Sequence, residues 1–257
     1  MNGAYYIGAT GLQAQQRGLD VIANNVANIN TPAFKRSEVR FSEMVAEPAV
    51  RDEDTPVVTD LPETLTGVQA SASPRIFEQG DLRETGKPFD IAVSGDGFLE
   101  VLGPGGQIWL WRGGTLRTNE EGFLETETGL LLKANIEIPE DASGLKIARD
   151  GKVTATTAGA EEPVELGTID LVMSRDTATL EAVGNGYYRV ADEEDLVTLN
   201  PGEDKGGVLV QGSIEQSNVE LTTEMVTLLL MQRAYAANAQ VVEAGDQLMA
   251  IANGLKR

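Results

Sequence analysis

The 257-residue chain contains no cysteine and no histidine. These two absences exclude thiolate nucleophiles, serine-histidine-aspartate triads, imidazole bases and the usual zinc ligands, and with them most hydrolytic mechanisms. Disulfides are excluded for the same reason. Carboxylates are the catalytic material that remains, since 40 residues are Asp or Glu.

Long apolar runs are also missing. The apolar segments, such as Leu228 to Met231, fall far short of the roughly 18 residues that a membrane-spanning helix needs. The first basic residue is Arg17, so the N-terminus lacks the charged and apolar regions of a cleavable secretion signal. We therefore expect no membrane insertion, and a chain that either stays in the cytoplasm or leaves by a specialised route.

Negative charge dominates the middle of the chain. Residues 1–40 carry four basic and two acidic side chains, and residues 213–257 carry three and five. This leaves 13 of the 20 basic and 33 of the 40 acidic residues for 41–212, which therefore holds the entire net charge of −20. Such a charge repels nucleic acid and anionic lipid and favours solubility. The nearly neutral ends are better suited to close packing.

The N-terminal segment has the spacing of an amphipathic helix. Its apolar residues follow steps of seven, three, four and three, which is typical of a helix stripe or a coiled-coil seam. Asn28 to Pro32 favours an end to this helix, because the residue before proline avoids the α region. The pattern predicts a helix from about residue 4 to residue 28. The stripe consists of Leu12, Leu19, Ile22, Val26 and Ile29.

The C-terminal segment predicts a second helix with two apolar heptad positions. Its start resembles a capping box, in which Ser217 accepts a hydrogen bond from a free backbone amide and Glu220 reaches back to another. Alanine at several seam positions favours close approach of another helix. The two heptad series are Leu230, Ala237, Ala244 and Ile251, and Ala234, Val241, Leu248 and Leu255.

Between the two helices the chain predicts an extended connector and a β domain. Residues 41–74 hold four prolines and the acidic cluster Asp52 to Asp54 with little periodicity, which is typical of a connector. Residues 75–211 hold short apolar runs separated by glycine-rich turns, the pattern of an all-β domain. We therefore predict an α+β chain with helical segments at 1–40 and 212–257 on either side of a mainly β middle.

Two terminal motifs resemble one family. Residues 23–35 read Ala-Asn-Asn-Val-Ala-Asn-Ile-Asn-Thr-Pro-Ala-Phe-Lys, which includes Asn24, Asn25 and Asn28. This run is similar to the N-terminal signature of the flagellar basal-body rod and hook family. Ser-Asn-Val-Glu at 217–220 and Met-Gln-Arg-Ala-Tyr at 231–235 resemble its C-terminal signature, and Phe89 to Val93 resembles part of its β domain. The length is about that of a distal-rod subunit.

The resemblance implies a structural subunit rather than an enzyme, with no cofactor and no metal. It implies terminal helices that pair within a subunit and also pack against neighbours in a helical polymer of the chain itself. It further implies contacts with other rod and hook subunits, export through the flagellar type III apparatus, and a place in the rod that crosses the periplasm. The stripe, heptad and asparagine residues named above are then the expected subunit interface.

One residue departs from the family pattern. Ala33 stands where the family usually has glycine. If this position takes a positive φ, alanine is strained there.

Several alternatives stay open on the sequence. The heptads also suit a helical hairpin inside one monomer. Paired carboxylates near Trp109 and Trp111 suit a carbohydrate-active enzyme, although nothing fixes a proton donor against a base. A monomeric β-rich binding module would place its chemistry in the middle domain. Calcium binding at Asp52 to Asp54 lacks the ligand spacing of an EF-hand. Within the family, a proximal-rod or hook subunit shares the same motifs.

Overall fold

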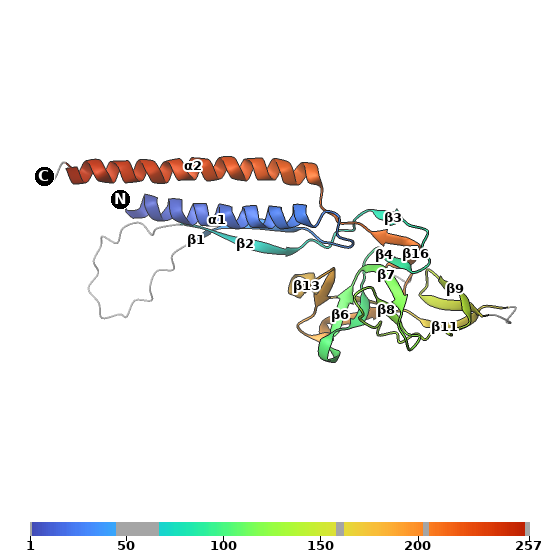
Figure 1. Cartoon of the computed structure of the whole chain (residues 1–257). Helices are drawn as coiled ribbons and strands as arrows, with labels where there is room; N and C mark the ends of the chain where they lie inside the picture. Colours follow the sequence, from blue (N-terminus) through green and yellow to red (C-terminus); the bar gives the residue numbers. More distant parts are fainter. Residues whose placement is uncertain (1, 45–66, 158–161, 203–205, 255–257) are drawn as a thin grey trace, which may run out of the picture. The chain divides into compact units, whose positions relative to one another are not determined.

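The computed structural model describes residues 2–44, 67–157, 162–202 and 206–254. The chain folds into two compact units. The first, here called the helix unit, comprises Met1–Val26, Ser37–Ser73 and Glu220–Arg257. The second, the β unit, comprises Ala27–Arg36 and Pro74–Val219. Two terminal helices thus flank a mainly β middle, which confirms the α+β prediction (Figure 1).

The helix unit contains α1 (Asn2–Ala27), α2 (Leu221–Gly254) and the two-stranded sheet of β1 (Ser37–Met44) and β2 (Gly67–Arg75). The predicted helix over 4–28 matches α1 within two residues. A turn follows α1 directly, with the amide of Thr31 donating to the carbonyl of Asn28 at 3.1 Å. This is the segment whose asparagines and proline predicted a helix end.

Helices α1 and α2 lie side by side and run antiparallel (Figure 1). Three glycines of α1 face α2: Gly8 lies opposite Val242, Gly11 opposite Asn238 and Gly18 opposite Met231. From Gly8 to Gly18 of α1 the partner residues in α2 descend from Val242 to Met231, so the two helices run in opposite directions. The sheet lies against α1 as well, because the guanidinium of Arg17 donates to the carbonyl of Ala70 at 3.0 Å.

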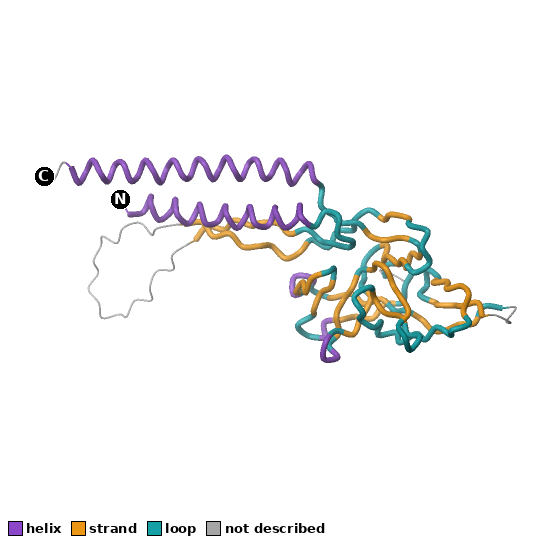
Figure 2. The backbone as a smooth tube through the Cα atoms, in the orientation of Figure 1, coloured by secondary structure: helices purple, strands orange, loops and turns teal. Residues whose placement is uncertain are grey.

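The β unit is built from short antiparallel strands and loops, with only brief helical turns (Figure 2). Two four-stranded sheets have the orders β16-β4-β7-β8 and β13-β14-β6-β5; a three-stranded sheet has the order β11-β10-β9, and two strand pairs are β12-β15 and β17-β3. In chain order the strands are β3 (Leu82–Glu84), β4 (Asp90–Ser94), β5 (Leu99–Leu102), β6 (Ile108–Trp111), β7 (Gly113–Thr118), β8 (Leu124–Thr126), β9 (Ala142–Ile147), β10 (Lys152–Thr157), β11 (Val164–Thr168), β12 (Leu171–Ser174), β13 (Glu181–Gly184), β14 (Tyr187–Arg189), β15 (Leu196–Leu199), β16 (Val208–Gln211) and β17 (Ser213–Glu215). The turns of 3-10 helix are η1 (Pro104–Gly106), η2 (Thr177–Thr179) and η3 (Glu193–Asp195).

Alternating burial along these strands produces two apolar clusters. The larger one includes Ile91, Leu99, Val101, Leu116 and Leu171, each at most 2% exposed. The smaller one contains an aromatic pair, Phe98 and Tyr188, packed edge-to-face at a centroid distance of 6.0 Å. Burial of this apolar surface is the main stabilising contribution to the β unit.

The unit boundaries differ from the expected segments in one respect. Residues 27–36 and 212–219 lie in the β unit, although the sequence pattern grouped them with the terminal helices. The physical reason is burial: Ala33, Phe34 and Lys35 are 1%, 7% and 0% exposed. Of the expected connector, 41–44 and 67–74 lie in β1 and β2, whereas 45–66, with Asp52 to Asp54, lies outside the described residues.

Candidate assembly interface

Small residues form the closest face of α1 towards α2. Gly8, Gly11 and Gly18 repeat at helical spacing along this face, and Ile22 and Asn25 continue it as buried side chains. The absence of a Cβ lets the two helices approach closely, because a Cβ built on Gly8 would lie 2.5 Å from Val242 Cγ2. The apolar stripe that the sequence singled out is only partly this face. Ile22 is buried, whereas Leu12, Leu19, Val26 and Ile29 are half-buried.

The α2 residues nearest to the three glycines of α1 are not among the predicted heptad positions. They are Met231, Asn238 and Val242. Leu230 precedes Met231 by one residue, so its side chain lies about 100° around the helix. Ala234 is half-buried, Leu255 lies outside the described residues, and the remaining heptad residues are exposed: Leu230, Ala237, Val241, Ala244, Leu248 and Ile251.

An exposed apolar stripe therefore runs along α2 beside the face that contacts α1. Leu230, Val241, Leu248 and Ile251 are 61%, 55%, 64% and 61% exposed. Helices of soluble proteins usually bury one apolar face and leave the other faces polar. A helix that is apolar on two faces is suited to contacts on both, so this stripe is the candidate interface for another subunit.

The start of α2 differs from the predicted capping box. The helix begins at Leu221, so Ser217 lies too far upstream to cap it. Its hydroxyl accepts a hydrogen bond from the amide of Val219 at 3.3 Å. The carbonyl of Glu220 accepts from the amide of Glu224 at 3.0 Å, which places Glu220 at the helix N-terminus. Its carboxylate accepts from the hydroxyls of Thr223 and Thr222, and these bonds lower the pKa of Glu220.

The asparagines of the N-terminal signature make bonds inside the subunit. Asn25 is 2% exposed. Its side chain donates to Glu224 Oε1 at 3.1 Å and to the carbonyl of Ser37 at 2.9 Å, and it accepts from the amide of Ser37 at 3.0 Å. Asn28 Oδ1 accepts from the hydroxyl of Thr31 at 3.2 Å, and Asn24 is exposed. Asn25 thus ties α1, β1 and α2 together within the helix unit.

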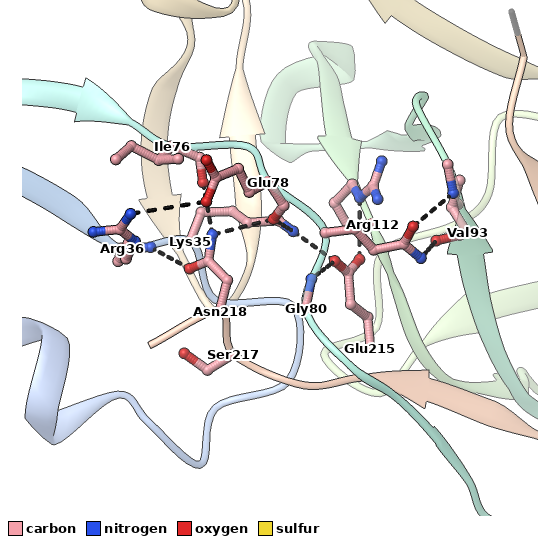
Figure 3. A network of polar contacts seen from close by, with 12 residues as sticks. Lys35, Arg36, Ile76, Glu78, Gly80, Val93, Arg112, Glu215, Ser217 and Asn218 are labelled. Atoms are coloured by element: carbon pink, nitrogen blue, oxygen red, sulfur yellow. Dashed lines mark hydrogen bonds and ion pairs between the residues drawn. The ribbon is translucent and has the colours of Figure 1, made fainter. Parts of the chain in front are cut away.

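A buried charge cluster inside the β unit links Lys35, the last residue of the N-terminal signature, to Glu215, which lies two residues before the C-terminal signature (Figure 3). The carboxylate of Glu215 lies between two cations, with Oε1 at 2.5 Å from Lys35 Nζ and Oε2 at 3.1 Å from Arg112 Nε. These three side chains are 0%, 0% and 4% exposed. Glu215 Oε1 also accepts from the amide of Gly80 at 2.9 Å. Spacing along the sequence gave no signal for this cluster, because Lys35 and Glu215 are 180 positions apart.

Backbone carbonyls and Asn218 complete this cluster. Lys35 Nζ donates to the carbonyl of Glu78 at 2.7 Å, and Arg112 Nη1 donates to the carbonyl of Gly97 at 2.6 Å. Asn218 Oδ1 accepts from the amide of Arg36 at 2.8 Å, and its amide group donates to the carbonyl of Glu78 at 3.1 Å (Figure 3). Buried charges are tolerated only when they are paired and hydrogen-bonded in this way.

Burial shifts two titrating groups at this site. Desolvation lowers the pKa of Lys35 below its usual value of 10.5, against the opposing attraction of Glu215. Desolvation likewise raises the pKa of Tyr188 from 10.0 to about 12. Both effects arise because a low-dielectric interior disfavours the charged form of an ionisable group.

Ala33 has a φ of 54°, in the left-handed region that favours glycine. The expected strain at this departure from the family pattern is therefore present. The residue is held there by burial and by its amide, which donates to the carbonyl of Glu215 at 2.9 Å.

The two tryptophans pack within the β unit. Trp111 is 5% exposed and stacks on Tyr187 within the core. Trp109 is partly buried, and its indole ring lies against Gly103, where a built Cβ would be 2.6 Å from the ring.

Neither of the helices described is long and apolar enough to span a membrane. Within the same described ranges, no group of three or more acidic side chains is arranged as a metal site. The described residues thus combine antiparallel helices from both ends of the chain with an exposed apolar stripe on one of them and a separate β unit, the architecture of a structural subunit.

Family models match three parts of the chain. Residues 6–35 match the flagella basal body rod protein model, residues 92–155 the flagellar hook protein FlgE/F/G D1 domain, and residues 210–255 the C-terminal model of the flagellar basal body rod FlgEFG proteins. The matches include most of both terminal helices and, in the β unit, the strands from β5 to β9.

Relatives align over nearly the whole chain. The flagellar basal-body rod protein FlgG of Borreliella burgdorferi is 34% identical over 99% of this chain and 98% of its own. FlgG of Caulobacter vibrioides is 34% identical over 96% and 97%, and FlgF of the same organism is 31% identical over 96% and 95%. The chain belongs to the flagellar basal-body rod protein family and is of the FlgG type, a structural subunit of the distal rod.

Proposed function

We propose that the chain polymerises through its terminal helices into a helical rod that transmits torque from the motor to the hook. The observation that carries this proposal is the exposed stripe of α2, formed by Leu230, Ala237, Val241, Ala244, Leu248 and Ile251. Contacts between different surfaces of identical subunits generate an open helical filament when they do not close on themselves. Helices packed along the filament supply axial and torsional stiffness.

The magnitude of this interface favours assembly with several neighbours at once. Fully burying a Val, Leu or Ile side chain contributes about 1.5–3 kcal/mol. The four large stripe residues are already partly buried, so covering the remainder contributes about 4–7 kcal/mol in total. This sum is comparable to the roughly 4–15 kcal/mol of lost rigid-body freedom on association. A free subunit is thus expected to stay monomeric until it meets a growing rod end that contacts it on several sides.

The family suggests the remaining parts of the proposal. Partners are other copies of the chain, adjacent rod and hook subunits, and the flagellar type III export apparatus through which the subunit leaves the cell. The location is the rod where it crosses the periplasm. The subunit is not an enzyme, takes no cofactor and does not insert into membrane. The net charge of −20 disfavours nucleic acid as a partner.

Substituting the stripe tests the interface. Val241→Asp and Leu248→Asp each place a carboxylate in an apolar contact, which costs several kcal/mol if it stays buried. We expect both variants to abolish motility and rod assembly while the β unit melts at the wild-type temperature. Gln247→Asp is the matched control, because Gln247 is exposed beside Leu248 but outside the stripe. Complete rods built by both stripe variants would contradict the proposed interface.

The position in the rod needs its own experiment, since the FlgF relative is also similar to this chain over nearly its whole length. Electron microscopy of basal bodies from a strain that lacks the protein should show a rod that stops before its distal part. A rod that stops at its base would indicate a proximal subunit, and a complete rod without a hook would indicate a hook subunit.

A further inference from the structure

Few backbone bonds hold the segment that follows α1 in the β unit. The amide of Ala33 donates to the carbonyl of Glu215 at 2.9 Å, and the carbonyl of Phe34 accepts from the amide of Asn218 at 3.3 Å. The carbonyl of Arg36 accepts from the amide of Ile76 at 2.9 Å. These three backbone–backbone bonds go to three different partners and do not form a strand ladder. Two side chains add a bond each, since the amide of Arg36 donates to Asn218 Oδ1 at 2.8 Å and Arg75 Nη1 donates to the carbonyl of Lys35 at 2.7 Å. Backbone pairing alone therefore specifies the alignment of this segment weakly.

Apolar contacts do not specify the alignment either. Ala33 and Phe34 are buried, but the hydrophobic effect is non-directional and depends mainly on the area removed from water. The ring of Phe34 lies under the guanidinium of Arg75, with 4.8 Å between Cζ and the ring centroid. Such a contact tolerates sliding better than a buried ion pair does.

The buried charge cluster is satisfied in one alignment only. Lys35 Nζ reaches Glu215 Oε1 and the carbonyl of Glu78 at the same point. A shift by one residue in one direction brings Phe34 there and leaves the carboxylate without this cation. A shift in the other direction brings Arg36, whose planar guanidinium is larger than the ammonium that the site encloses. Either shift leaves buried polar groups poorly paired, which is strongly unfavourable.

We propose that Lys35, Glu215 and Arg112 are positioning residues that fix the alignment of residues 33–36 against residues 212–219 in the free subunit. Their contribution is specificity of docking rather than net stability. The first of these segments directly precedes β1 and the second ends just before α2, so both are aligned within the β unit before any neighbour binds. The use of this arrangement in rod assembly rests on the proposed function, whereas the alignment itself is a property of the free chain.

Amide hydrogen exchange of the full-length monomer, measured residue by residue by NMR, tests this inference. The test variant combines Lys35→Met, Arg112→Leu and Glu215→Leu, which replaces the charges by apolar side chains of similar size. Apolar replacement of a buried charge cluster commonly preserves or raises stability. We expect the core amides of Leu99 and Leu110 to exchange at the wild-type rate. The amides of Ala33 and Arg36 should exchange about a hundredfold faster, because their partners are no longer held in one place.

The control is the exposed ion pair of Lys133 and Glu100, whose Nζ–Oε1 distance is 2.8 Å. Replacing it by Met and Leu should change exchange at neither Ala33 nor Arg36. Wild-type protection at Ala33 and Arg36 in the triple variant would overturn the inference. If the triple variant does not fold, the single variant Glu215→Gln replaces it in the test. A rise in amide exchange rate confined to residues 33–36 supports the inference, and an equal rise in exchange rate throughout the core refutes it. Because no polymer is involved, these results are independent of whether the stripe of α2 mediates assembly.

Discussion

Two identical substitutions in α1 should have opposite effects on the helix unit. Gly8 and Gly18 both lie in the helix interior and both face α2. Replacing an interior glycine by alanine stabilises a helix by about 1 kcal/mol, because glycine loses more backbone freedom on folding. The difference between the two sites therefore comes from what the added methyl group meets.

At Gly8 the new Cβ would lie 2.5 Å from Val242 Cγ2, and valine is stiff at χ1. Overpacking of this kind costs about 1–3 kcal/mol, so Gly8→Ala should destabilise the helix unit by up to about 2 kcal/mol net. At Gly18 the nearest atoms are Met231 Sδ and Cε at 3.4 Å, the end of a flexible side chain. Gly18→Ala should stabilise by about 1–2 kcal/mol, since it adds helix propensity and buries a methyl group.

Urea unfolding followed by circular dichroism at the helix band measures both variants. The double variant Gly8→Ala/Val242→Ala is the control, because it removes the methyl group that the new Cβ meets, and it should recover most of the loss. If Gly8→Ala stabilised as much as Gly18→Ala, the close approach of α1 and α2 at Val242 would be refuted.

Three further predictions concern the β unit, with tryptophan fluorescence as the measure of its unfolding. Because the pKa of Tyr188 is raised to about 12, its stabilising contribution is complete below pH 10 and is lost as the pH rises through 12. The free energy of unfolding should fall by about 3 kcal/mol over this range. Tyr188→Phe should abolish this pH dependence. Glu215→Leu alone leaves two buried cations unpaired and should cost about 3–5 kcal/mol, whereas Lys133→Met, at an exposed ion pair, should cost under about 1 kcal/mol; equal costs would contradict the burial of the cluster. Ala33→Gly relieves about 1–2 kcal/mol of left-handed strain but loses a similar amount through the entropy of the unfolded chain and the buried methyl group; a destabilisation above about 2 kcal/mol would show that the methyl group outweighs the strain.

In α2, the apolar face predicted from heptad spacing differs from the face that contacts α1. The heptads at Leu230 and Val241 predicted a helix and an apolar seam, and the helix is present from Leu221 to Gly254. The face that contacts α1 instead uses Met231, Asn238 and Val242. Periodicity identifies every apolar face of a helix, but it does not say which face a neighbouring element covers. That choice depended on the glycines of α1, which carry no hydrophobic signal of their own.

In the β unit, likewise, some strands follow from a local sequence pattern and others do not. The apolar run Ile108 to Trp111 coincides with β6. Strand β10, by contrast, has four polar residues among its six and no continuous apolar run, and it forms by pairing with β9 and β11. Such strands form because of their cross-strand partners, so the sequence of a single segment does not predict them.

The sequence by itself determined the two terminal helices, the mainly β middle, the concentration of negative charge in that middle and the family to which the chain belongs. Each of these depends on composition or on residues within a few turns of one another. The tertiary structure decided the close packing of α1 on α2, the union of residues 27–36 with the β unit, and the cluster of Lys35, Arg112 and Glu215. These features depend on contacts between residues that are from 40 positions (Arg36 and Ile76) to 234 positions (Gly8 and Val242) apart. Physical contact across such separations is set by the folded chain as a whole and leaves no local pattern in the sequence.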